Sequence, residues 1–170
     1  MKNFTIIAAF DRDRGVGIKG DLPWHISADL KHFSRTTRGG TVIMGNRTWD
    51  SIPEKHRPFP ERLNIVLCRE PGWGLGLPTE VFITDNIETA LVHALQNNPE
   101  GDAFVIGGGQ VFNSLIVHEK CNRLILTEID HIFECDTFFP EIPEHFSRIH
   151  ESDPQEEKGF TFRFVTYEPK

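Results

Sequence analysis

Hydrophobic residues in this chain form short continuous runs that alternate with stretches of helical periodicity. The runs at 6–10, 42–44 and 65–67 show no polar alternation, which is typical of strands covered on both faces of a sheet. The last run, 160–167, alternates with period two and predicts an antiparallel strand with one wetter face. The pattern predicts strands over 3–10, 41–44, 63–68, 80–84, 103–107, 122–129 and 160–167, and helices over 27–37, 46–52, 87–97 and 110–116.

The order of these elements predicts one α/β domain over residues 1–170. We expect a mainly parallel central sheet that ends in an antiparallel strand, with about four flanking helices. The 38% hydrophobic and 25% charged residues are ordinary for a soluble globular protein. A formal net charge of −7 argues against a nucleic-acid partner, because such proteins are usually basic. An anionic ligand would therefore need local cations and backbone amides.

The sequence also restricts location and metal binding. No run is long and apolar enough to cross a membrane, and the first run meets charged residues at once without a small-residue cleavage site. The cysteines, Cys68, Cys121 and Cys135, show neither metal-ligand nor disulfide spacing. We therefore expect a cytoplasmic protein without a metal site, and nothing in the sequence indicates more than a monomer.

One acidic residue stands out within 22–33, a predicted turn followed by a helix with Ser27 as its N-cap. Asp29 lies on the face that should turn inward, and no Lys or Arg occupies a matching position on that face. A carboxylate aimed into an apolar crevice costs several kcal/mol (order of magnitude) unless it is paired, so we expect a ligand as partner. An ordinary helix start, where aspartate is common, is the alternative. The inner face is defined by Ile26, Leu30, Phe33 and Thr37.

Three glycine-containing segments follow predicted strands. The segment 15–20 matches G-x-G-x-x-G, but the next helix is expected only at 27, so it is not a dinucleotide fingerprint. A mobile loop over an active site and a plain glycine-rich loop both fit it. The segments 107–109 and 45–48 each lead from a strand into a helix, where free N–H groups suit phosphates. Two such turns could clasp a diphosphate, although a tight turn without ligand and, for Arg47, a plain surface charge stay open.

Three further arginines are candidates for anion binding. Arg69 ends a buried strand, where it could hold a phosphomonoester such as the 2′-phosphate of NADPH, or form a salt bridge with Glu70. Arg57 and Arg62 end a proline-rich loop beside Phe59 and could grip a carboxylate bidentately. The pattern does not separate these two arginines, and ordinary surface placement fits each.

Taken together, these motifs resemble the dihydrofolate reductase family over nearly the whole chain. Each motif is weak alone, but their order and spacing are specific. The matching segments are 7–9, Gly17, 22–24, 29–30 with Phe33, 44–45 with 48–49, 51–53, 62–64, 106–109, 126–129, 136–137 and 139–140.

The resemblance implies a mixed eight-stranded sheet and the reduction of 7,8-dihydrofolate by NADPH. Hydride would pass from nicotinamide C4 to pterin C6 while N5 gains a proton through water, and the 15–24 loop would close over the site. Antifolates such as methotrexate or trimethoprim would be ligands. Asp29 matches the residue that hydrogen-bonds the pterin; burial should raise its pKa more than the helix start lowers it.

The resemblance also implies roles for other residues around the substrate. Thr127 matches a hydroxyl that supports Asp29, Trp24 a residue that holds a water, and Leu22 a further catalytic position. Arg62, rather than Arg57, matches the cation that binds the substrate's α-carboxylate. The remaining implied pocket positions are Ile7, Ala8, Leu30, Phe33, Ser51, Ile52, Phe59 and Ile106.

For the cofactor, the resemblance implies a cis peptide between Gly107 and Gly108. Asn46 replaces a basic residue often found beside the 2′-phosphate, so Arg47 and Arg69 would carry more of that task. Phe112 stands where many bacterial members have Tyr. The implied cofactor contacts are Ala9, Val16, Gly17, Gly20, Asp21, Gly45, Asn46, Arg47, Thr48, Leu67, Cys68, Arg69, Ile106, Gly108, Gly109, Gln110, Val111 and Phe112.

Two other functions remain open at this point. A pyrimidine reductase of related fold would share the glycine turns but would need neither Asp29 nor Arg62. A non-enzymatic nucleotide-binding module would bind NADPH without oxidising it.

Overall fold

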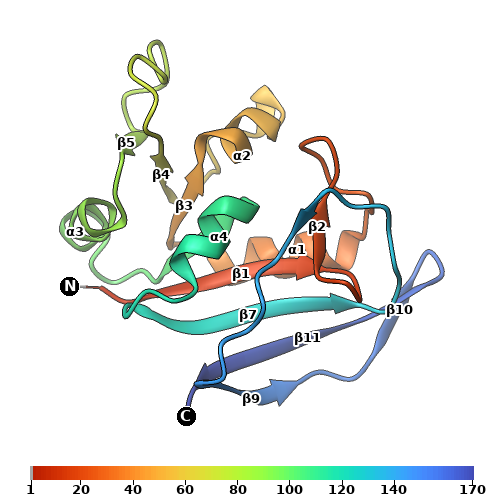
Figure 1. Ribbon diagram of the computed structural model, residues 1–170. Coiled ribbons are helices and arrows are strands. Elements are labelled where there is room, and N and C mark those ends of the chain that lie inside the picture. The colour runs from red at the N-terminus through yellow and green to blue at the C-terminus, as the bar shows by residue number, and fades with distance from the viewer. Residues whose placement is uncertain (1) are drawn as a thin grey trace.

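The protein is built on a large mixed sheet, which Figure 1 shows together with the helices that flank it. The computed structural model describes residues 2–170. Nine strands form the main sheet, in the order β10-β11-β7-β1-β6-β3-β4-β5 with β9 pairing β11, and β2 pairs β8 separately. The strands are β1 Phe4–Phe10, β2 Gly15–Gly17, β3 Thr41–Gly45, β4 Leu63–Leu67, β5 Phe82–Thr84, β6 Ala103–Gly107, β7 Cys121–Ile129, β8 Thr137–Phe138, β9 Phe146–Glu151, β10 Gln155–Glu157 and β11 Phe160–Pro169.

The strand directions confirm the expected topology. Every pair from β7 across β1, β6, β3 and β4 to β5 is parallel, whereas β11 runs antiparallel to β7, β9 and β10. The expected count of eight strands is wrong, since nine are paired in the main sheet. The pattern did not predict β2, β8, β9 or β10. Most of these are short, and glycine or charged residues leave them little hydrophobic signal.

Helices cover both faces of the sheet. In Figure 1, α1 lies behind β1 and α4 lies in front of it. The α3 and α4 side chains belong to one large apolar cluster with alternate residues of β1, while α1 and α2 take part in two smaller clusters. The helices are α1 Ser27–Thr37, α2 Asn46–Ser51, α3 Ile87–Asn97 and α4 Gly109–Leu115, with a 3₁₀ turn over Glu54–His56.

Three local expectations are wrong. Ser27 is the first residue of α1, and Ile26 precedes it as N-cap without a side-chain bond. Leu30, expected on the inner face, is 47% exposed. On β11 the buried residues Phe162 and Val165 are three apart rather than two, because both faces of this strand are partly covered.

The topology gathers chain turns at one edge of the sheet. β3 and β6 are parallel neighbours, and α2 and α4 begin directly after or close to their carboxyl ends. Ligands of open α/β sheets bind outside this edge. Among residues 2–170, no helix has the length and apolarity needed to span a bilayer.

Candidate active site

The inward-facing acid expected from the sequence, Asp29, is half-buried and has one side-chain partner among residues 2–170. Thr127, 2% exposed on β7, donates a hydrogen bond of 2.6 Å from Oγ1 to Oδ1 of Asp29 in the first turn of α1. None of the cations in residues 2–170 forms an ion pair with Asp29. Burial raises the pKa of Asp29, and the Thr127 hydrogen bond lowers it by less. The expected raised pKa is therefore confirmed, and Oδ2 remains for a ligand.

Trp24 lies in an aromatic cluster at the same end of α1. Its ring centroid is 5.2 Å from that of Phe133, and it packs with Ile26, Ile129 and Phe162. The indole Nε1 is buried and has no hydrogen-bond partner among the described residues. Since a buried N–H without a partner is costly, this donor fits an ordered water or a ligand atom.

Arg62 is held by the far end of α1. Its Nε donates to Thr37 Oγ1 at 2.9 Å, Nη2 to Ser34 O at 3.0 Å and Nη1 to Pro60 O at 2.8 Å. Nη1 has a second N–H, which is available to a ligand carboxylate. The guanidinium carbon lies 5.7 Å from the Phe59 ring centroid. The hydrophobic periodicity predicts Thr37 only as a core position. It gives no indication that the Thr37 hydroxyl accepts a hydrogen bond from Arg62.

Arg57 has a different task. Its Nη1 donates to the carbonyls of Trp49 at 2.8 Å and Ile52 at 2.9 Å, which lie at the end of α2. The guanidinium carbon also lies 5.5 Å from the Trp49 ring centroid. Helix carbonyls without intrahelical partners are thus satisfied by Arg57. Arg57 therefore stabilises the end of α2 and Arg62 is fixed against α1, while the choice of Arg62 as the cation that binds a substrate carboxylate stays a prediction from the resemblance.

The other predicted substrate positions form two apolar groups. Phe33 of α1 and Phe59 lie with ring centroids 5.6 Å apart. Ile52, Phe59 and Ile106 pack against the cluster of β3 and β4, while Ala9, a predicted cofactor position, packs against the cluster of Trp24. Ile7 is buried and Ala8 half-buried on β1, whereas Leu22, Leu30 and Ser51 are exposed.

The two glycine turns lie against one another as expected. The peptide bond between Gly107 and Gly108 is cis, as the resemblance implies. A Cβ built on Gly45 would lie 3.1 Å from Val111 Cγ2, and one built on Gly108 would lie 3.3 Å from Thr48 Oγ1. One built on Gly109 would lie 2.5 Å from Thr137 Cγ2, so only glycine fits there. The bare backbone of these turns gives a phosphate close access to N–H groups.

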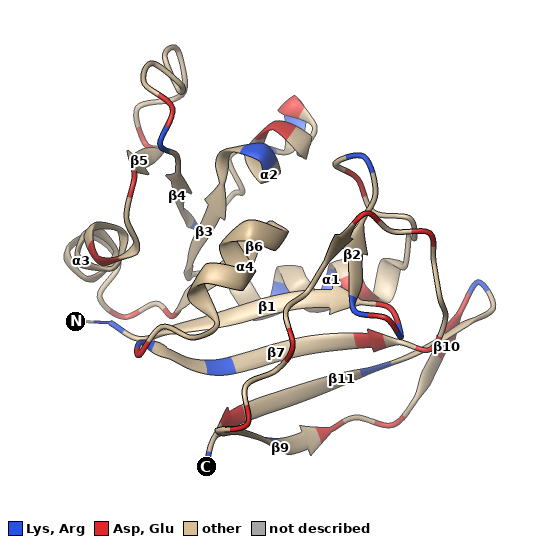
Figure 2. Ribbon diagram, viewed as in Figure 1, with Lys and Arg blue, Asp and Glu red and all other residues tan. Residues whose placement is uncertain are grey.

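The remaining predicted cofactor positions surround these turns. Arg47 and Arg69 are exposed and form no ion pair with residues 2–170, so the expected alternative of an Arg69–Glu70 bridge is not seen. Figure 2 shows basic residues, blue on the ribbon, at the start of α2 and just after β4. Of the rest, Val16, Leu67, Val111 and Phe112 pack in the main core, Asn46 and Cys68 are half-buried, and Gln110 is exposed.

The 15–24 segment is held by a second loop. Gly17 O accepts from Asp136 N at 2.9 Å, and Asp136 Oδ2 accepts from Lys19 N at 2.9 Å. A bridge between Ile18 and Asp21 turns the chain, with Gly20 at φ +77°. No helix opens on Gly15 to Gly20, in agreement with the rejected dinucleotide fingerprint. The mobility of this loop stays a prediction.

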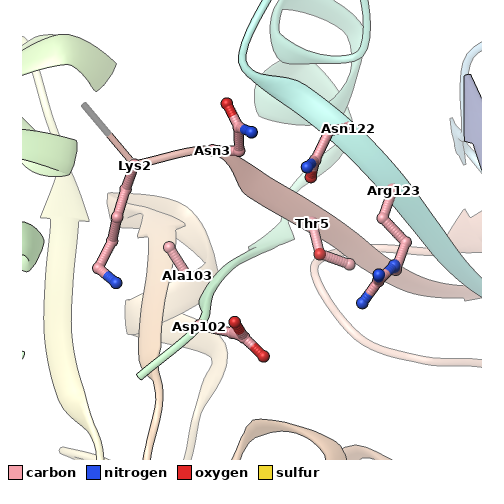
Figure 3. A pocket seen from close by; sticks show the side chains of 7 residues that line it. All are labelled: Lys2, Asn3, Thr5, Asp102, Ala103, Asn122 and Arg123. Atoms are coloured by element: carbon pink, nitrogen blue, oxygen red, sulfur yellow. The ribbon is translucent and has the colours of Figure 1, made fainter. Parts of the chain in front are cut away.

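A separate hollow of about 200 Å³ lies at the amino end of the sheet (Figure 3). Its cations are already engaged: Lys2 Nζ donates to Gly101 O at 2.6 Å, and Arg123 Nε to Glu168 at 3.0 Å. It therefore offers no free cation to an anionic ligand and lies at the opposite end from the glycine turns. Residues 2–170 contain no group of His, Cys, Asp or Glu arranged to hold a metal.

The fold and the site together define an α/β protein with an inward-facing acid and two glycine turns at one edge of its sheet. The dihydrofolate reductase family profile matches residues 3–169. The chain is 38% identical to dihydrofolate reductases of Aedes albopictus and Drosophila melanogaster, covering 99% of this chain and 98% of each relative. It is 36% identical to a bifunctional dihydrofolate reductase-thymidylate synthase of Zea mays, covering 98% of this chain and 34% of that protein. The chain belongs to the dihydrofolate reductase family.

Proposed function

We propose that this protein reduces 7,8-dihydrofolate to tetrahydrofolate with NADPH, as a single-domain cytoplasmic monomer. The observation that carries the proposal is the half-buried carboxylate of Asp29, which accepts one hydrogen bond, from Thr127, and forms no ion pair with a cation of residues 2–170. The free Cys68, Cys121 and Cys135 agree with a reducing compartment.

Asp29 binds the pterin ring. When ionised, it accepts from the ring N3–H and the 2-amino group, and such charge-assisted hydrogen bonds contribute roughly 1.5–3 kcal/mol each. Thr127 fixes the orientation of the carboxylate through Oδ1. A planar heterocycle with adjacent donors is the ligand that this acceptor geometry suits.

Arg62 binds the other end of the substrate. The α-carboxylate of its glutamate accepts from the guanidinium, whose orientation Thr37 and Ser34 fix. The facing rings of Phe33 and Phe59 pack against the aminobenzoyl group between the two polar anchors. Two anchors at opposite ends set the position of the pterin along the cleft.

The glycine turns fit a pyridine dinucleotide. Gly45, Gly108 and Gly109 present bare backbone beside Thr48, as the close Cβ approaches require, and Arg47 and Arg69 supply charge for the 2′-phosphate. When bound, NADPH supplies the hydride for pterin C6. The chain holds the two rings in contact and limits the entry of water through the 15–24 loop.

The proton for N5 arrives through water. No second carboxylate lies on the inner face of α1, and the buried Trp24 Nε1 has no protein acceptor among residues 2–170. This donor holds a water, through which a proton from solvent reaches N5 while the ionised Asp29 holds the pterin ring.

The test is an absorbance assay at the reduced-nicotinamide band. We expect NADPH to be consumed when dihydrofolate is added and the reaction to stop with methotrexate, while trimethoprim tests the same site. Binding of NADPH without its oxidation would indicate a nucleotide-binding module instead. Oxidation with a pyrimidine substrate but not with dihydrofolate would indicate the related pyrimidine reductase.

A further inference from the structure

The start of α1 is capped by a residue from the other end of the chain. Glu157, the last residue of β10, accepts a hydrogen bond of 2.6 Å at Oε2 from Ser27 N. Its Oε1 accepts from Ser27 Oγ at 2.9 Å and from Ala28 N at 3.1 Å. Figure 2 shows this acidic strand end beside the basic tip of its hairpin.

These donors are helix amides that have no partner within α1. The amides of Asp29 and Leu30 bond back to Ile26 O, at 3.1 and 3.2 Å, but those of Ser27 and Ala28 do not. Ile26 provides no side-chain acceptor as N-cap. Glu157 therefore caps the amino terminus of α1, a role that a Ser, Thr or Asp at the N-cap position usually has. The amides in turn lower the pKa of Glu157, so it stays ionised at neutral pH.

This arrangement leaves the carboxylate of Asp29 free. An aspartate in a first helical turn commonly turns back to the free amides of its own helix. Here those amides are already engaged by Glu157, and the only hydrogen bond to Asp29 from residues 2–170 comes from Thr127. Ala28, which Glu157 holds, is the neighbour of Asp29 in the chain.

We propose that Glu157 is a positioning residue for the reaction: it fixes the first turn of α1 and thereby keeps the Asp29 carboxylate directed at the substrate. This inference rests on the proposed function. It assigns a role in substrate binding to the β10 strand, none of whose residues is among the predicted substrate positions.

The experiment compares Glu157→Ala and Glu157→Gln with Glu156→Ala in the full-length chain. Glu156 is exposed on the same strand and forms no side-chain hydrogen bond or ion pair with residues 2–170. At saturating NADPH, we expect Glu157→Ala to raise the KM for dihydrofolate about ten-fold and to lower kcat about three-fold. Glu157→Gln keeps one acceptor oxygen and should raise KM about three-fold. The Kd for NADPH, measured by tryptophan fluorescence without substrate, should equal that of wild type in all three variants.

The results separate positioning from a purely structural role. A lowered Tm with unchanged KM and kcat well below Tm would overturn the proposal, as would an equal loss of affinity for NADPH. If Glu157→Ala does not fold, unchanged kinetics in Glu157→Gln would also overturn it. A wild-type protein that does not reduce dihydrofolate would overturn the proposed function and this inference together; normal wild-type turnover with an unaffected Glu157→Ala would overturn this inference alone.

Discussion

Thr127 and Asp29 are 98 positions apart in the chain and are joined by a hydrogen bond of 2.6 Å from Oγ1 to Oδ1. The bond links β7 to the first turn of α1, so the central sheet itself orients the acid. Because it uses only one acceptor position of the carboxylate, the remaining lone pairs are open to a ligand. The pair is thus prepared for a substrate that carries its own donors.

Asp29→Asn tests the role of the acid in the reaction. The amide has one oxygen and cannot accept two donors from the pterin, so we expect turnover at neutral pH to fall about 10²-fold or more. The fold and the Kd for NADPH should be unchanged. Steady-state assays and fluorescence titration check both, and turnover like that of wild type would contradict the assignment.

The same substitution should stabilise the protein without ligand. Since burial raises the pKa of Asp29 in the folded state, the ionised form is disfavoured by folding at neutral pH. The variant should gain about 1 kcal/mol at pH 7. This gain should begin as pH rises above the ordinary aspartate pKa, should be complete above the raised pKa, and should vanish at lower pH, where the acid is protonated in both states. Urea unfolding of both proteins from pH 3 to 8 measures this gain in the free energy of unfolding. A gain found only at low pH would contradict a raised pKa of Asp29.

Thr37→Val tests how Arg62 is oriented. The hydroxyl accepts from Arg62 Nε and lies fully buried, so valine removes the bond at nearly the same volume. We expect the KM for dihydrofolate to rise about five- to ten-fold with kcat nearly unchanged, because binding of ground and transition states weakens equally. Thr37→Ser keeps the hydroxyl and serves as the control. An unchanged KM in the valine variant would remove Thr37 from the site.

Arg57→Ala should mainly affect stability, whereas Arg62→Ala should mainly affect substrate binding. Arg57 satisfies carbonyls at the end of α2, so its loss should lower the free energy of unfolding by about 1–3 kcal/mol with little change in KM. Arg62→Ala should instead raise the KM for dihydrofolate strongly. Urea titration and steady-state kinetics of the two variants check this. A raised KM in Arg57→Ala together with a loss of stability alone in Arg62→Ala would show that the two roles are exchanged.

Arg69→Ala tests cofactor choice. Removing a cation that contacts the 2′-phosphate should narrow the preference for NADPH over NADH about five- to ten-fold. Arg123→Ala, which removes an equal charge at the amino end of β7, is the control. The ratio of specificity constants for the two cofactors is the measurement, and an unchanged ratio would exclude Arg69 from this contact.

Several parts of the structure could be predicted from local pattern. Buried strands are recognisable as continuous apolar runs. The predicted ends of β1, β3, β4 and β6 agree with the observed ends to within about one residue. The strands β9 and β10 could not be predicted, because their residues are mostly polar and show no hydrophobic pattern. Their extended conformation is fixed by pairing with β11. The cis bond at Gly107 came from the family pattern and not from periodicity.

By itself, the sequence determined the α/β class, the inward-facing acid of α1, the two glycine turns and the family. These depend on residue types and on spacing within short segments. Only the tertiary structure decided that Arg57 bonds the carbonyls at the end of α2, that Thr37 orients Arg62, and that Glu157 caps the start of α1. Each of these is a hydrogen bond between separate elements, and its partner is chosen by packing in space rather than by position in the chain.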